Sequence, residues 1–90
     1  TIIYCLQMGG SHASPAHVGV LTDCALICQT TADYLIRGSD LHAPVCGVCA
    51  TVCNACADSC DQFSGDAQMK TCADLCRTCA KSCQVLAATP

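Results

Sequence analysis

Cysteine is the residue whose number and spacing most directly suggest chemistry in this sequence. There are 12 cysteines in 90 residues. Nine of them form two series with alternating steps of three and four residues: Cys46, Cys49, Cys53, Cys56 and Cys60, then Cys72, Cys76, Cys79 and Cys83. Thiolates are the ligands that soft metal ions prefer, Cu(I) above all and then Zn(II) or iron–sulfur clusters. The cysteines therefore predict a soft-metal site.

The spacing of these cysteines is that of a helix face. Side chains three and four residues apart lie on the same side of an α-helix, so each series forms a straight row of thiols. The same alternation marks the core positions of helical bundles, where leucine and isoleucine are usual. A shorter row, Cys24 and Cys28, precedes the two series, and Cys5 stands near the start. We predict that facing helices bring all these thiols into one interior.

Start and stop signals divide the chain into four predicted helices. Ser14-Pro15 is a typical helix start, and Gly38 a typical stop. Ser39 and Asp40 are expected to cap the third helix, and Asp66 the fourth. Short connections favour antiparallel neighbours. We predict one all-α domain over residues 1–90, an antiparallel up-down-up-down four-helix bundle with a truncated first helix, its helices at about 1–8, 15–37, 40–62 and 66–87.

The composition excludes several classes of protein. The formal net charge is −3 with only four Lys and Arg residues, so no surface for nucleic acid or an anionic membrane is expected. We find no apolar run approaching the roughly 20 residues of a membrane-spanning helix. Disulfide bonds are disfavoured, because cysteines on one helix face point the same way and a disulfide needs converging Cβ atoms. A reduced, metal-binding core is the remaining interpretation of so many thiols.

The straight rows favour many Cu(I) ions over one discrete site. Zn(II), the less favoured ion, closes a single tetrahedron with four ligands, and iron–sulfur motifs wrap the backbone around a cluster. A helix face does neither. An iron–sulfur or dithiol redox protein stays open as an alternative, since Cys46 and Cys49 also have the spacing of a redox motif. No base is placed beside a nucleophile, so an enzyme is not expected.

Other soft ligands are predicted at the ends of the bundle. If the helices alternate in direction, Met8, His17 and Met69 gather at one end, where thioether and imidazole groups are candidate entry ligands for Cu(I). His42 is a further candidate at the opposite end. His12 falls in a loop, and we assign it no role.

The sequence resembles the bacterial four-helix-bundle copper storage proteins, a cysteine-rich family once of unknown function and sometimes mislabelled ferredoxin. Three segments carry the resemblance, which covers nearly the whole chain: residues 23–28, 46–60 and 72–83. It implies Cu(I) held by core thiolates, loading through a polar or Met/His-lined bundle end, and assembly as a homo-oligomer, a dimer or tetramer. Family members usually have a full first helix with several cysteines. The short segment carrying Cys5 therefore suggests that residues are absent here or that a partner chain completes the bundle.

These observations lead to one functional expectation. We expect the chain to store or buffer several Cu(I) ions, and so to limit copper toxicity, with all twelve cysteines as ligands. A chaperone or sensor that delivers copper to a partner is the second alternative to storage. We expect a cytoplasmic protein, with the periplasm as the alternative because the sequence starts at Thr1 and a signal peptide before it would not be seen.

Overall fold

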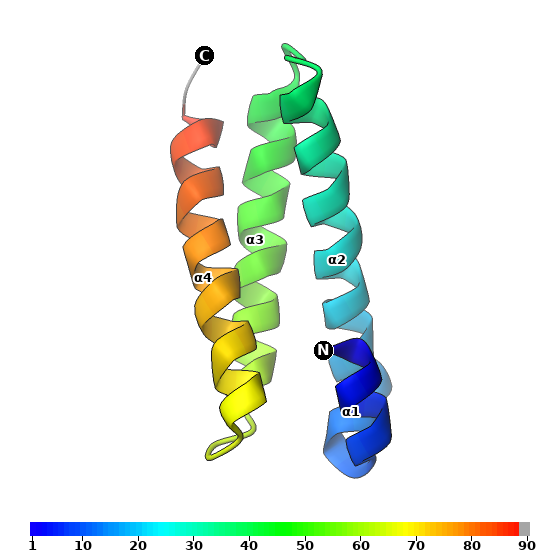
Figure 1. Cartoon of the computed structure of the whole chain (residues 1–90). Helices are drawn as coiled ribbons and strands as arrows, with labels where there is room; N and C mark the ends of the chain where they lie inside the picture. Colours follow the sequence, from blue (N-terminus) through cyan, green and yellow to red (C-terminus); the bar gives the residue numbers. More distant parts are fainter. Residues whose placement is uncertain (89–90) are drawn as a thin grey trace.

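The computed structural model describes residues 1–88, and over these residues the chain is helical, without a strand (Figure 1). The α-helices are α1 (Ile2–Met8), α2 (Pro15–Ile36), α3 (His42–Cys60) and α4 (Ala67–Ala87), with a short 3₁₀ helix, η1 (Gly10–Ala13), after the first. Residues 89 and 90 of the predicted domain lie outside the described part of the chain. The molecule measures 42 × 18 × 17 Å along its principal axes, as expected for an elongated bundle.

Successive α-helices run in opposite directions. α3 lies between α2 and α4 and packs along both, while α1 lies beside the lower part of α2 (Figure 1). α1 has 7 residues, whereas α2, α3 and α4 have 22, 19 and 21, so α1 covers only one end of the bundle. The predicted all-α, antiparallel four-helix bundle with a short first helix is confirmed.

Two polar side chains fix the starts of α2 and α4. The hydroxyl of Ser14 accepts a hydrogen bond from the backbone N–H of His17 at 3.2 Å, and a proline follows at the first helical position. Asp66 caps α4 through Oδ1, which accepts from two backbone N–H groups of the first turn. Both caps are those predicted from the sequence.

α3 differs from the prediction at both ends. Its N-cap position is Leu41, not Ser39 or Asp40, and no side chain caps it. The hydroxyl of Ser39 accepts instead from the backbone N–H of Leu41 at 3.1 Å, so it stabilises the turn before the helix. The helix ends at Cys60 and leaves Phe63 in the turn that leads to α4.

Cysteine fills most of the core. The largest side chains with less than 2% exposure are Met69 and six cysteines: Cys5, Cys46, Cys49, Cys53, Cys56 and Cys60. Buried alanines accompany them on α3 and α4, where small side chains let the two helices approach: Ala50, Ala57, Ala73 and Ala80. A free cysteine packs as a small hydrophobic residue. Sulfur therefore replaces the aliphatic side chains of an ordinary bundle.

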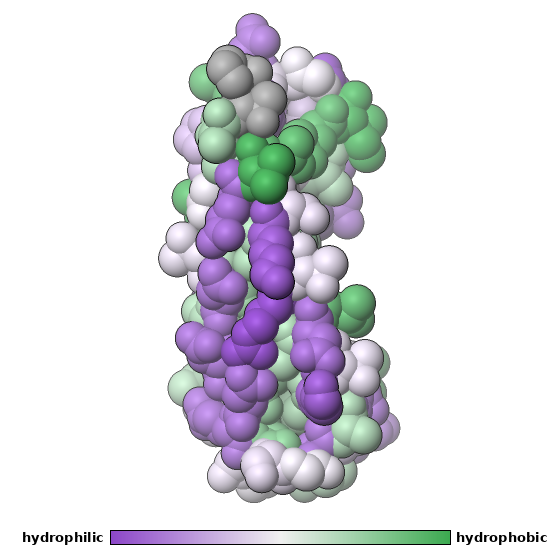
Figure 2. Space-filling view, turned by 90° about the vertical axis from the view of Figure 1, so that its left-hand side faces the viewer, coloured by the Kyte–Doolittle hydropathy of each residue, from purple (hydrophilic) through white to green (hydrophobic). Residues whose placement is uncertain are grey.

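Polar side chains cover much of the outside. On the face in Figure 2, hydrophilic residues run in stripes along the helices. Arg77 of α4 pairs with Asp58 and Asp61 at the end of α3, and Lys70 pairs with Asp74 one turn away. Such exposed pairs add little stability individually, but those of Arg77 connect α3 to α4.

By length and composition alone, α3 is long and apolar enough to cross a membrane. The sequence predicts no membrane-spanning segment, because it contains no long uninterrupted apolar run. In this structure α3 is the central helix, and its cysteine row is buried between its two neighbours. The core helix of a bundle and a membrane span share this composition, because both are apolar on most sides.

Candidate metal centre

The central thiol group joins three helices. The sulfur atoms of Cys28 on α2, Cys49 and Cys53 on α3, and Cys79 on α4 all lie within 4.8 Å of one another. Cys28 Sγ is 3.6 Å from Cys53 Sγ and 3.8 Å from Cys49 Sγ, and the two α3 sulfurs are 3.9 Å apart. Four thiols from three elements thus meet at one point in the core.

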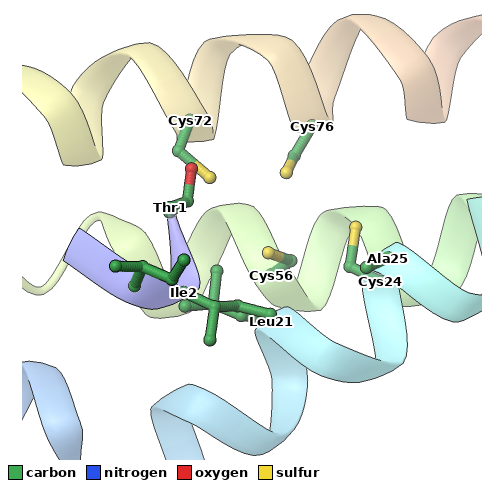
Figure 3. A pocket seen from close by; sticks show the side chains of 9 residues that line it. Thr1, Ile2, Leu21, Cys24, Ala25, Cys56, Cys72 and Cys76 are labelled. Atoms are coloured by element: carbon green, nitrogen blue, oxygen red, sulfur yellow. The ribbon is translucent and has the colours of Figure 1, made fainter. Parts of the chain in front are cut away.

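Two further thiol groups continue toward the lower end of the bundle in Figure 1. Cys24, Cys56 and Cys76, one each from α2, α3 and α4, lie within 4.8 Å of one another and point inward (Figure 3). Cys56 also belongs to the next group, with Cys60 and Cys72. Cys24 Sγ is 3.8 Å from the sulfur of Cys53 in the central group. The three groups therefore form one continuous ladder of sulfur atoms.

A side cavity borders the lower part of this ladder. It has a volume of about 440 Å³ and is lined by the start of α1, by Leu21, and by four cysteines of the two lower groups: Cys24, Cys56, Cys72 and Cys76 (Figure 3). Cys24 and Cys76 are each 8% exposed, so these thiols are nearly but not fully sealed from solvent.

The upper end of the ladder contains Cys46 and Cys83, which are also buried. Thr31 of α2 continues the row of Cys24 and Cys28 and is 3% exposed. Its hydroxyl donates to the carbonyl oxygen of Ile27 at 2.7 Å. A threonine therefore occupies the place where the spacing of α2 would put its next thiol.

The lower end of the bundle brings three different soft donors together. Cys5 Sγ lies 3.3 Å from Nε2 of His17 and 3.7 Å from Sδ of Met69. All three side chains are buried. Ser59 Oγ is 2.7 Å from the other ring nitrogen of His17 and fixes the orientation of the imidazole. We call Cys5, His17 and Met69 the loading end, after the entry ligands expected there from the sequence.

The other candidate entry ligands differ from these three residues in burial or position. Met8, the last residue of α1, is 53% exposed, whereas His17 and Met69 are buried. His42 lines a cavity of about 410 Å³ at the opposite end, with Leu35 and Leu86. Its Nδ1 donates to the carbonyl oxygen of Ser39 at 3.0 Å.

Sequence reasoning missed the residues around the loading end. His12 donates from Nε2 to Oδ2 of Asp66 at 3.0 Å, and the hydroxyl of Tyr4 donates to the same oxygen at 2.7 Å. The bond from Tyr4, with those from His12 and the first turn of α4, holds the pKa of Asp66 below its ordinary value. Ser59 supports His17 from α3. No periodic pattern marks these residues, and only the capping role of Asp66 was predictable.

Burial determines the protonation of most of the thiols. It is the main cause that raises the pKa of Cys60, to about 12, and it also raises the pKa of Cys28, Cys53 and Cys83. Burial lowers the pKa of His17, so this imidazole is neutral at neutral pH. Metal ions that bind these thiols as thiolates must displace their protons.

The thiols of Cys56 and Cys76 titrate as a pair. Their hydrogen bond stabilises a thiolate on Cys76 and so lowers its pKa, while the same bond raises the pKa of Cys56. At Cys49 burial raises the pKa, but hydrogen bonds from neighbouring thiols, among them that of Cys28, help to outweigh it, and the net shift lowers the pKa. Some core thiols thus ionise more readily than burial alone would permit.

A bundle that lines its interior with thiols and closes one end with thiol, imidazole and thioether groups is a soft-metal-binding protein. The chain belongs to the copper storage protein family, whose model matches residues 1–88. The Nmul_A1745 protein of Nitrosospira multiformis, known from a crystal structure, is 42% identical with a TM-score of 0.90, and the match covers 97% of this chain and 77% of that one. No curated protein matches the chain. The family resemblance seen in the sequence is confirmed.

Proposed function

We propose that this protein stores copper as Cu(I), several ions per chain, on the thiolates of its core. The observation that carries the proposal is the sulfur ladder, in which every cysteine except Cys5, Cys46 and Cys83 lies in a group with sulfurs within 4.8 Å of one another. Cys56 belongs to two of these groups, and a shared thiolate can bridge two ions. A ladder of this kind supports a row of ions better than one isolated site.

The sulfur spacing suits metal binding without a large rearrangement. Ligand sulfurs about 2.3 Å from a shared metal ion lie about 3.8 to 4.0 Å from one another. The measured separations around Cys28 and Cys53 are 3.6 to 4.0 Å. The sulfur atoms of the core are therefore spaced much as the ligands of a metal-thiolate site are.

The donor set favours Cu(I) over Zn(II). The central group has the four thiols of a structural Zn(II) site, but the other two groups, Cys24–Cys56–Cys76 and Cys56–Cys60–Cys72, offer only three thiols each. Cu(I) accepts fewer ligands and prefers soft sulfur. Storage is a non-enzymatic role, and the family to which the chain belongs supports it.

We further infer that copper enters at the loading end. His17 is neutral, and neither imidazole nor thioether has to lose a proton before it binds Cu(I). Most thiols deeper in the core have to lose a proton before they bind Cu(I), since burial raises the pKa of Cys28, Cys53 and Cys60. His17 and Met69 would therefore receive the ion first and pass it to Cys5 and the ladder.

The test is an anaerobic titration of the fully reduced apo protein with Cu(I) in competition with a chromophoric chelator. We expect tight binding of several ions per chain, together with release of protons. Saturation at one or two ions would contradict storage and favour a shuttle or sensor, and visible absorption from iron in the isolated protein would favour a redox protein. A parallel titration with Zn(II) serves as the control for selectivity.

A further inference from the structure

A cap of three side chains closes the loading end. His12, on η1, stacks against Phe63, their ring centroids 3.8 Å apart. Phe63 also lies against His17, with a centroid separation of 4.8 Å, while the two imidazoles are 6.5 Å apart. Phe63 thus contacts both rings, and His17 is left only 3% exposed. We call His12, Phe63 and Asp66 the cap.

Within the cap, Asp66 holds the side chain of His12 in position. Its Oδ2 accepts the bond from His12 at 3.0 Å, and these two side chains are 14% and 16% exposed, respectively. Its other oxygen, Oδ1, caps α4. The two oxygens of this carboxylate therefore have separate roles. Oδ1 caps the N-terminus of α4, and Oδ2 holds η1 over the loading end through His12.

The segment that carries His12 follows a turn built from two glycines. Gly9 and Gly10 have φ angles of 68° and 54°, in the region that favours glycine. The backbone hydrogen bonds described for residues 9–14 connect close neighbours in sequence, such as Ser14 to Ser11. Within the described residues, the hydrogen bonds and ring contacts that join η1 to the turn between α3 and α4 are made by the side chain of His12.

The turn between α3 and α4 leaves room beside the ring of Phe63. A cavity of about 250 Å³ is lined by Phe63, Asp66 and Cys60, among other residues of the turn and of α4. If His12 leaves, the phenyl ring loses its stacking partner on one side and has open volume beside it. The loading end can then open without unwinding α2, α3 or α4.

We propose that the cap is a gate that controls how fast copper reaches the core. η1 swings away about Gly9 and Gly10, and Phe63 follows. A Cu(I) complex with a small thiol or chelator then exchanges its ligands for His17, Met69 and Cys5, and the proton of the Cys5 thiol passes to the departing ligand or to water. The gate rests on the proposed function, since it regulates the same loading end. It changes the rates of entry and exit but not the final number of ions bound.

Two variants test the gate. His12→Ala removes both the stacking on Phe63 and the bond to Asp66. Asp66→Ser removes Oδ2, and with it the bonds from His12 and Tyr4, but keeps a hydroxyl that can cap α4, so the fold is preserved. In each, we expect the rate of Cu(I) uptake from a chelator complex to rise about fivefold, the factor expected for the loss of one net hydrogen bond. The rate of removal by excess chelator should rise equally, leaving capacity and affinity unchanged.

The side cavity supplies the matched control. Ala25 lines this cavity, and Ala25→Trp narrows it without touching the cap. We expect uptake at the wild-type rate. Slower uptake in Ala25→Trp, combined with unchanged uptake in His12→Ala, would overturn the gate and place entry at the side cavity. Slower uptake in His12→Ala would overturn it as well, because His12 would then be acting as a copper ligand.

A copper-free measurement separates the gate from storage. Cys5 is fully buried, so its alkylation by iodoacetamide in the apo protein reports opening of the loading end. Mass spectrometry should show faster labelling of Cys5 in His12→Ala and Asp66→Ser, with unchanged labelling of Cys46 at the opposite end. Equal labelling of Cys5 in all variants contradicts the gate, whereas low copper capacity of the wild type contradicts storage alone.

Discussion

The sulfur of Cys28 on α2 lies 3.6 Å from the sulfur of Cys53 on α3. Through this contact the short thiol row of α2 joins the long row of α3, and both residues belong to the central group. Burial raises the pKa of both thiols, so the pair is protonated at neutral pH and available to exchange protons for metal.

Removing this pair should lower the copper capacity. We expect Cys28→Ala/Cys53→Ala to bind roughly one or two fewer Cu(I) ions per chain, because each ion needs two or three thiolates. Helicity should persist, since alanine is small and favours helices. Cys46→Ala is the control, with a buried thiol from the same row that lies outside the three groups. An equal or larger loss of capacity in Cys46→Ala would contradict the central role of the pair.

The two methionines should differ in their effect on loading. Met69 is buried against Cys5, whereas Met8 is 53% exposed. We expect Met69→Leu, which nearly conserves volume, to slow Cu(I) uptake several-fold at unchanged capacity. Met8→Leu should load at the wild-type rate. Stopped-flow measurements with a chromophoric Cu(I) complex compare the uptake rates of the two variants. Slow uptake by Met8→Leu would support Met8 as an entry ligand.

Extending the thiol row of α2 should add a ligand. Thr31 is buried in register with Cys24 and Cys28, while its neighbour Thr30 is exposed. We expect Thr31→Cys to fold and to bind up to about one more Cu(I) ion per chain, since the new thiol would face Cys49. Thr30→Cys, with its thiol on the surface, should leave the core capacity unchanged in a chelator competition. Equal gains in copper capacity in both variants would show that the added ion does not depend on a thiol in the core.

The reduced apo protein should lose stability in alkali. Below the ordinary thiol pKa of about 8.5, the folded and the unfolded chain both keep the proton of Cys60. Above it, the unfolded chain loses protons that the folded chain retains, because burial raises the pKa of Cys60 to about 12. The free energy of unfolding therefore falls as pH rises toward the folded pKa.

Urea unfolding monitored by circular dichroism measures this dependence. The midpoint should decline above about pH 9, where the unfolded chain has lost the thiol proton that folded Cys60 retains. Cys60→Ala should decline less steeply, because one of the retained protons is gone. An identical slope in Cys60→Ala would show that other groups cause the alkaline loss.

Local chemistry made the helices and thiol rows predictable. Ser14 and Asp66 act on backbone groups within one turn, so their caps follow from neighbouring residues alone. Spacing on a helix is equally local, and it placed Cys46, Cys49 and Cys53 on one buried face. The predicted start of α3 was wrong because the hydroxyl of Ser39 accepts a hydrogen bond within the turn before the helix.

The sequence by itself therefore determined the bundle, the thiol rows and the soft-metal chemistry. The tertiary structure decided which donors meet, since distances between helices depend on how far each helix extends and where its neighbours pack. It brought Met69 and His17 to Cys5 and left Met8 exposed at the end of α1. It also placed His12 of η1 on Phe63 of a distant turn, a contact between a short 3₁₀ helix and a turn that no sequence period encodes.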